Sequence, residues 1–135
     1  MSIAQPALAA LHVHSPETRI AVIGASNDPS KYGNIIIRNL LRHGYSVLPI
    51  HPREAEIAGL KAHARVADIV GPIAIANLVV PPAVALSVVA DLDPQQVGVV
   101  WFQPGSFDDA VIAAAQARFA HVVAGDCIMV VANWA

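Results

Sequence analysis

The chain has 135 residues, the length of one domain, of which 56% are hydrophobic and only 13% are charged. A formal net charge of -2 at pH 7 gives no electrostatic reason to expect a nucleic-acid partner. The apolar runs are too short to span a membrane, and residues 1–18 lack the charged start and apolar core of a signal peptide. A single cysteine, Cys127, excludes an internal disulfide and is typical of a reducing compartment, so we expect a cytoplasmic protein without a membrane partner.

The predicted elements alternate between strands and helices. Short apolar runs, several rich in β-branched residues, predict strands over 19–23, 46–50, 73–80, 97–102 and 121–124. Apolar residues at helical spacing predict helices over 34–43, 83–92 and 107–119, the last with Ser106 as its N-cap. Shorter helices are expected over 6–13 and 66–70, and residues 125–135 are expected to form an apolar tail. We therefore expect an N-terminal extension over residues 1–18 and one domain over residues 19–135.

This alternation is typical of an α/β protein. It predicts a Rossmann-like, doubly wound parallel five-stranded sheet with helices on both faces, a three-layer α/β/α arrangement. Right-handed crossovers favour a strand order near 3-2-1-4-5. Ligands of such sheets bind beyond the carboxyl ends of the strands, so the loops of interest are 24–33, 51–54, 81–84 and 102–106.

The first of these loops has the features of a phosphate-binding loop. Gly24 ends a buried strand and lets the backbone turn tightly, and Gly33 opens the next helix. The small residues between them begin with Ala25, Ser26 and Asn27. Backbone N–H groups and the positive end of a helix dipole at such a junction attract an anion, most often a phosphate. The loop lacks a complete GxGxxG pattern and a Walker A lysine, so a solvated turn is the alternative interpretation.

The second loop carries a cation where NAD sites carry an acid. His51, Pro52 and Arg53 follow the second predicted strand, at the place where an Asp or Glu would bind the ribose hydroxyls of NAD. A cation there favours a ribose that carries a phosphate, as in NADP or coenzyme A. The alternative is that Arg53 pairs on the surface with Glu54 or Glu56.

The two remaining loops contain few groups that could do chemistry. Pro81 and Pro82 follow Val80 and predict either a rigid apolar wall against an adenine or a pantetheine arm, or the plain start of a helix. Gln103 follows the fourth predicted strand, and its amide could donate to a carbonyl or a phosphate.

Neither a catalytic set nor a metal site can be placed from the spacing of the residues. The six histidines are not at metal-ligand spacing, apart from His12 and His14, for which a surface role is preferred. Cys127 is interpreted as a buried small hydrophobe, although a thiol near a thiol cofactor could form a mixed disulfide.

Six segments in the right order and spacing resemble the small stand-alone CoA-binding domain proteins. These segments, between residues 19 and 127, are AVIGASNDPSKYG, PIHPRE, EIAGLKAH, VVPP, VWFQPG and GDC. The family is similar to the CoA-binding domain of the succinyl-CoA synthetase α subunit and of NDP-forming acyl-CoA synthetases. The resemblance implies a Rossmann-like fold that binds coenzyme A across the point where the strand order reverses, with no well-established activity for stand-alone members.

The resemblance also implies a role for each matching residue. The residues expected to line or flank the pyrophosphate are Gly24, Ala25, Ser26, Asn27, Tyr32 and Gly33. The residues that match the family's asparagine-proline-lysine are His51, Pro52 and Arg53, so Arg53 would hold a CoA phosphate. The residues expected to flank the adenine or the pantetheine are Val80, Pro81 and Pro82. Gln103 would approach the thiol end.

The chain departs from the family pattern in three places. His51 replaces the usual asparagine, and Gly125-Asp126-Cys127 lacks the arginine of the family's Asp-Arg-Cys. The loop DPSKYG and residues 1–18 are also not standard. The synthetases carry a phosphorylated histidine and an ATP-binding domain that this chain does not contain. We therefore expect no complete ligase reaction from it alone.

The resulting hypothesis is a non-catalytic module that binds coenzyme A or an acyl-CoA. One alternative is an NADP-binding, oxidoreductase-like protein. A second alternative is an interaction subunit with a vestigial nucleotide site, in which the apolar tail over residues 128–135 makes the contact. The high apolar content with few charges also predicts that a second subunit, either another copy or a partner, covers part of the surface.

Overall fold

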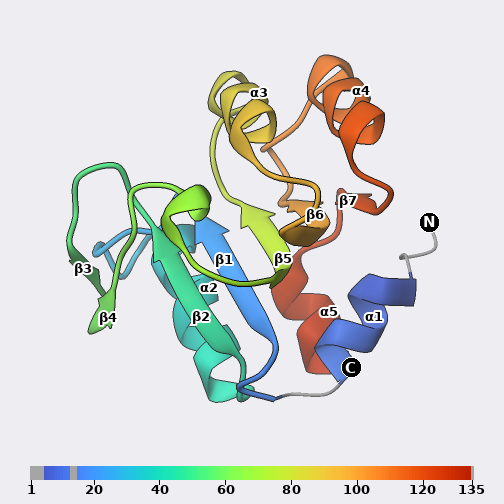
Figure 1. Cartoon of the computed structure of the whole chain (residues 1–135). Helices are drawn as coiled ribbons and strands as arrows, with labels where there is room; N and C mark the ends of the chain where they lie inside the picture. The colour runs from blue at the N-terminus through green and yellow to red at the C-terminus, as the bar shows by residue number, and fades with distance from the viewer. Residues whose placement is uncertain (1–4, 13–14, 135) are drawn as a thin grey trace.

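A five-stranded parallel sheet lies between two layers of helices in the computed structural model, which describes residues 5–12 and 15–134 (Figure 1). The sheet strands are β1 (Arg19–Ile23), β2 (Ser46–Ile50), β5 (Ile73–Leu78), β6 (Val97–Phe102) and β7 (Val122–Ala124). A separate antiparallel hairpin consists of β3 (Glu56–Ile57) and β4 (Leu60–Lys61). The helices are α1 (Gln5–His12), α2 (Tyr32–Arg42), α3 (Pro82–Asp91), α4 (Asp109–Arg118), α5 (Ile128–Trp134) and the 3-10 helix η1 (Val66–Asp68). The predicted doubly wound α/β class is confirmed.

The central strands are buried on both faces, which explains why they are continuous apolar runs. In β1, Ile20 and Val22 pack into the layer of α1, α2 and α5, whereas Ala21 packs into the layer of η1, α3 and α4. Neighbouring Trp101 and Phe102 of β6 likewise belong to opposite layers, and neither has exposed surface. Successive side chains of a strand point to opposite faces, so each strand contributes to both halves of the core.

The strand order differs from the predicted one. Numbered along the chain, the five sheet strands lie in the order 2-1-3-4-5, because β5 pairs with β1 and not outside β2. The outer edge of β2 is occupied by the segment that follows it. There the His63 N–H donates to the Pro49 carbonyl at 3.0 Å, and the His51 N–H donates to the His63 carbonyl at 2.9 Å. The reversal of strand order therefore lies between β1 and β5, where open α/β sheets bind their ligands.

The start of α4 differs from the prediction. The N-cap is Asp108 and not Ser106, since the Asp108 carboxylate accepts a hydrogen bond from the Val111 N–H at 2.9 Å. The Ser106 hydroxyl instead accepts from the Val80 N–H at 3.2 Å and so links the exit loop of β6 to that of β5. Residues 79 and 80, predicted as the end of the third strand, belong to this loop.

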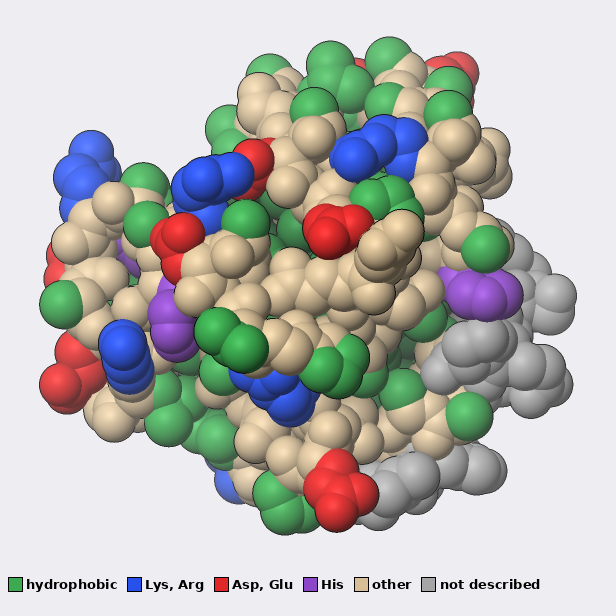
Figure 2. Space-filling model, viewed as in Figure 1, with side chains coloured by type: hydrophobic (Ala, Val, Ile, Leu, Met, Phe, Trp, Pro, Cys, Tyr) green, Lys and Arg blue, Asp and Glu red, His purple; other side chains and the backbone are tan. Residues whose placement is uncertain are grey.

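The predicted apolar tail contains a helix. Its Ile128 and Ala132, one turn apart, are fully buried in the layer that α5 shares with α1 and α2. No helix in the described ranges has the length and apolar character needed to cross a bilayer. Figure 2 shows hydrophobic side chains gathered over α3 and α4, where Val84 and Leu86 are exposed.

The N-terminal helix packs onto the sheet layer. Ala7 and Leu11 of α1 are fully buried. The Tyr45 hydroxyl donates to the Leu11 carbonyl, and the Thr18 hydroxyl donates to the Ala10 carbonyl at 3.3 Å. The predicted helix end at residue 13 and the residue His14 lie outside the described residues. The division between residues 18 and 19 stays a prediction.

Two glycines let three backbone segments touch at the carboxyl ends of β1 and β5. Gly24 has φ +97°, and a Cβ added to it would lie 2.2 Å from the Val79 carbonyl oxygen. A Cβ added to Gly33 would lie 2.0 Å from the Gly24 carbonyl oxygen. The Val79 N–H also donates to the Ile23 carbonyl at 2.8 Å. The β1–α2 loop (residues 24–31), the start of α2 and the β5–α3 loop are therefore held against one another.

Replacement of Gly33 by alanine is expected to lower the free energy of unfolding by about 1–3 kcal/mol, because the new methyl group overlaps the Gly24 carbonyl. Denaturant unfolding measures this change. In an open helix the same substitution stabilises by about 1 kcal/mol, so a stability gain would contradict the close contact.

The Tyr45 hydroxyl is expected to make stability depend on alkaline pH. Burial raises the pKa of Tyr45 to about 12, whereas the unfolded chain has a value near 10. The contribution of the neutral phenol is complete below pH 10 and is lost as the pH rises toward 12. Between pH 9 and pH 11 the wild type should lose about 1 kcal/mol more stability than Tyr45→Phe. Denaturant unfolding of both proteins at both pH values measures this difference. An equal loss of stability in the wild type and in Tyr45→Phe would exclude the effect.

Candidate functional site

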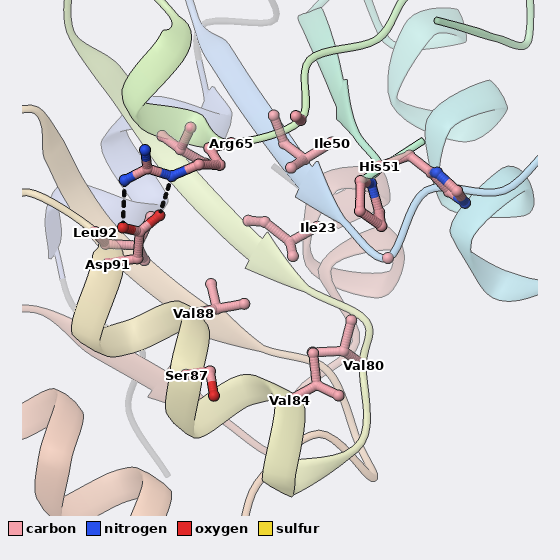
Figure 3. A pocket seen from close by; sticks show the side chains of 14 residues that line it. Ile23, Ile50, His51, Arg65, Val80, Val84, Ser87, Val88, Asp91 and Leu92 are labelled. Carbon is pink, nitrogen blue, oxygen red and sulfur yellow. Dashed lines mark hydrogen bonds and ion pairs between the residues drawn. The ribbon is translucent and has the colours of Figure 1, made fainter. Parts of the chain in front are cut away.

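An elongated cavity opens at the carboxyl ends of β1 and β2, against α3 (Figure 3). We call it the α3 pocket. Its volume of about 510 Å³ lies within the range of small-molecule sites. The aliphatic side chains that line it are Ile23, Ile50, Ala64, Val66, Val80, Val84, Val88 and Leu92. The pocket therefore offers mainly apolar surface, and its polar side chains are His51, Arg65, Ser87 and Asp91.

Helix α3 supplies one wall because it is apolar on more than its buried face. Ala85 and Val89 are buried against the sheet. Val84, Val88 and Asp91 line the pocket, and their spacing of four and three residues places them on one stripe of the helix. The distance along this stripe from Val84 to Asp91 is about 10 Å, at 1.5 Å per residue.

The β1–α2 loop leads to a helix N-terminus that no side chain caps. Lys31 occupies the N-cap position of α2 without a side-chain hydrogen bond, and the first turn contains no acidic residue. Within the described ranges, the N–H groups of Ala25, Ser26 and Asn27 have no acceptor. Free amides and an uncapped helix dipole provide a place for an anion.

Two side chains of α2 that sequence reasoning missed hold this loop in place. The Asn34 amide donates to the Ser26 carbonyl at 2.9 Å. Arg38, one turn further along α2, donates to the Asn34 side-chain oxygen at 2.6 Å and to the Pro29 carbonyl at 3.1 Å. The spacing of four residues between them is the one signal in the sequence that could have suggested the pair.

The Asn27 side chain anchors the loop on the opposite side. Its amide nitrogen donates to the Glu56 carbonyl at 2.9 Å, and its oxygen accepts from the Ala58 N–H at 3.1 Å. The side chain is thus engaged with the β3–β4 hairpin, and what Asn27 still offers an anion is its backbone N–H.

A negative charge sits within the same loop. Asp28 accepts from the Ser30 hydroxyl at 2.7 Å and from the Ser30 N–H at 2.9 Å. These two hydrogen bonds, with a smaller contribution from Lys31, lower the pKa of the Asp28 carboxyl. Asp28 therefore stiffens the turn as a carboxylate.

The loop after β2 is organised by a histidine. The Nδ1 atom of His51 accepts hydrogen bonds from the N–H groups of Arg53 and Glu54, both at 3.0 Å. Because Nδ1 accepts, the ring proton lies on Nε2. His51 and Pro52 line the α3 pocket, whereas Arg53 is exposed and does not. Within the described ranges the Arg53 guanidinium forms no ion pair, so the alternative pairing with Glu54 or Glu56 is not present.

An ion pair that sequence reasoning missed spans the end of the α3 pocket (Figure 3). Arg65 Nε donates to Asp91 Oδ2 at 2.9 Å, and Arg65 Nη2 donates to Asp91 Oδ1 at 2.5 Å. Their hydrogen bonds lower the pKa of the Asp91 carboxyl and raise that of the Arg65 guanidinium. Both side chains are about half exposed. No local pattern signals the pair, since the partners are 26 residues apart.

The two prolines after β5 start a helix, as one of the two interpretations expected. Pro81 is the N-cap of α3 and Pro82 follows at its first position. The apolar wall is instead formed by Val80, which lines the α3 pocket. Contact of either proline with a ligand stays a prediction.

A smaller cavity of about 150 Å³, which we call the Cys127 pocket, lies on the other side of the β5–α3 loop. It is lined by Tyr32, Val79, Gln103, Pro104 and Cys127. Gln103 is buried, and its side-chain oxygen accepts from Asn77 Nδ2 at 3.2 Å and from the Ile128 N–H at 2.8 Å. Its amide nitrogen donates to Cys127 Sγ at 3.3 Å. Gln103 therefore braces the start of α5, and Cys127 is only partly buried.

The structure divides the predicted residues between two cavities that flank one loop. Those that line the α3 pocket are Gly24, His51, Pro52 and Val80. Those that line the Cys127 pocket are Tyr32 and Gln103. Those that line neither cavity are Ala25, Ser26, Asn27, Gly33, Arg53, Pro81 and Pro82. In the part of the chain that the structure describes, no three His, Cys, Asp or Glu side chains are grouped to hold a metal ion.

The chain is similar both to part of a much longer ligase subunit and to a protein of about its own length. Subunit alpha of the ADP-forming acetate–CoA ligase II of Pyrococcus furiosus is 48% identical over 63 residues, which cover 46% of this chain and 14% of the relative. A hypothetical protein from Pyrococcus horikoshii OT3 has a similar structure with a TM-score of 0.83 and 28% identity, covering 99% of this chain and 98% of the other. This chain therefore spans a small part of the ligase subunit and almost all of the small protein.

A synthetase of known structure contains a region similar to this chain. The dinucleotide-forming acetyl-coenzyme A synthetase 1 of Ca. Korarchaeum cryptofilum, in complex with phosphate and ADP, matches with a TM-score of 0.59 and 38% identity. The match covers 67% of this chain and 20% of the synthetase. The family model described as CoA binding domain matches residues 18–133, which include every loop of both cavities. The chain belongs to the CoA binding domain family.

Proposed function

We propose that the chain binds coenzyme A or an acyl-CoA, as a binding module without a reaction of its own. One observation carries the proposal. The N-terminus of α2, which no side chain caps, and three loop amides without acceptors lie beside an aliphatic cavity. The amides suit a pyrophosphate, and the cavity suits a flat, weakly polar ring. A nucleotide needs both features, because its phosphates bind the amides while its base occupies the cavity.

The proposed pose begins at the β1–α2 loop. The pyrophosphate accepts hydrogen bonds from the N–H groups of Ala25, Ser26 and Asn27, with the dipole of α2 behind them. Arg53 follows His51 and Pro52 at the margin of the α3 pocket, and its exposed side chain has no ionic partner in the described ranges. It can therefore turn toward a phosphate without losing an existing ion pair.

The adenine and the pantetheine arm occupy opposite sides of the β5–α3 loop in this pose. The base lies in the α3 pocket against Val80 and Val84, and the arm passes over the loop to the Cys127 pocket. The volume of about 150 Å³ there suits a thiol or a short acyl group. Gln103 and Tyr32 line that end.

Calorimetric titration of the purified protein with CoA, dephospho-CoA and NADP tests the proposal, after mass spectrometry for a co-purified ligand. Binding of CoA supports it. Binding of NADP without CoA would replace it by the oxidoreductase-like alternative, and binding of none of the three would leave a scaffold with a lost site.

Substitution of Arg53 by alanine is expected to weaken CoA binding by about 1–3 kcal/mol, because one charge-assisted hydrogen bond to phosphate is lost. Arg42→Ala serves as the matched control, since Arg42 lies at the far end of α2. An unchanged dissociation constant for Arg53→Ala would remove Arg53 from the site.

A further inference from the structure

We propose that Arg65 is a phosphate-binding residue of the α3 pocket and that Asp91 occupies its guanidinium until a phosphate monoester replaces the carboxylate. This inference rests on the proposed function, because it concerns a nucleotide in the same pocket. It assigns Arg65 the recognition of a terminal phosphate, such as the 3′-phosphate of CoA, and Asp91 the role of a competitor for the same guanidinium.

Arg65 is suited to this role by its position. Among the described residues, Arg65 is the only Lys or Arg that lines the α3 pocket, whereas Arg53 does not line it. A phosphate monoester that comes to rest beside aliphatic walls loses water and needs a cation as a neighbour. Arg65 and Asp91 lie toward the C-terminal end of α3, about two helical turns from Val84.

The chemistry of the pair permits an exchange of partners. Arg65 binds Asp91 through two parallel hydrogen bonds, at 2.9 Å and 2.5 Å, an arrangement that a phosphate can reproduce with its oxygens. The two N–H groups used in this way form the side of the guanidinium that a phosphate would take over from the carboxylate. Exposed ion pairs contribute little to stability, and this pair is about half exposed, so a doubly charged phosphate can displace the carboxylate.

Asp91 in turn limits how tightly a phosphorylated ligand binds. As an ionised carboxylate at the pocket it repels an incoming phosphate and competes for the same guanidinium. A phosphorylated ligand gains Arg65 only by displacing Asp91, and a ligand without the phosphate monoester leaves the pair intact. The carboxylate therefore weakens the binding of the phosphorylated ligand relative to what Arg65 alone would give.

The simplest competing explanation is that the pair only braces the segment before η1 against α3. Arg65→Gln and Asp91→Asn break such a brace equally, so a purely structural role predicts the same change in ligand affinity for both. The proposal predicts opposite changes. Arg65→Gln should weaken CoA about tenfold, and Asp91→Asn should tighten CoA by about threefold to tenfold.

The experiment is a calorimetric titration of the wild type and both variants with CoA and with dephospho-CoA, with thermal unfolding of each variant recorded alongside. Affinities for dephospho-CoA should change less than twofold in either variant. Asp109→Asn is the matched control, because it removes the same charge from an exposed position on α4. The gain from Asp91→Asn should also shrink at high salt.

Two results would overturn the inference while leaving the proposed function intact. One is a CoA affinity that falls in both variants, and the other is a change in Arg65→Gln that is the same for CoA and dephospho-CoA. Failure of the wild type to bind CoA at all would instead overturn the proposed function, together with this inference.

Discussion

The backbone contact among the β1–α2 loop, the start of α2 and the β5–α3 loop is the constraint on which the candidate site depends. No side chain larger than hydrogen fits at Gly24 or Gly33, because a carbonyl oxygen lies about 2 Å from where each Cβ would be. This contact fixes the two cavities on opposite sides of Val79 and Val80. It also positions the loop amides at the point where the strand order reverses, which is the place where a parallel sheet of this kind binds ligands.

Most polar side chains around the site hold backbone segments in place. Asn27 ties the loop to the β3–β4 hairpin, Asn34 ties it to α2, and Gln103 holds the start of α5. His51 organises the turn after β2 in the same way. What remains for a ligand is a set of backbone N–H groups and an aliphatic wall, with charge supplied by arginines at the margins. Such a surface suits the proposed nucleotide ligand, through its shape and its phosphate charge.

The local pattern of apolar residues predicted an element well where the structure of that segment depends mainly on its own residues. The run over 19–23 formed the expected strand, and the small residues after it formed the expected loop with free amides. The N-cap of α4 was wrong by two residues, because Asp108 and Ser106 are both good caps and only the contact with Val80 decided between them. Helix α5 was missed because its seven residues, IMVVANW, are mostly apolar and show no amphipathic stripe.

The sequence alone determined the fold class, the positions of the loops at the carboxyl ends of the strands and the family resemblance, because these depend on short-range periodicity and on the order of motifs. Only the tertiary structure decided the strand order, in which β5 pairs with β1 while His63 bonds to the backbone at the carboxyl end of the other edge of β2. Only the tertiary structure brought Arg65 to Asp91, across 26 residues of chain. Contacts between segments far apart in the sequence depend on how whole elements pack. A local run of residues therefore does not predict them.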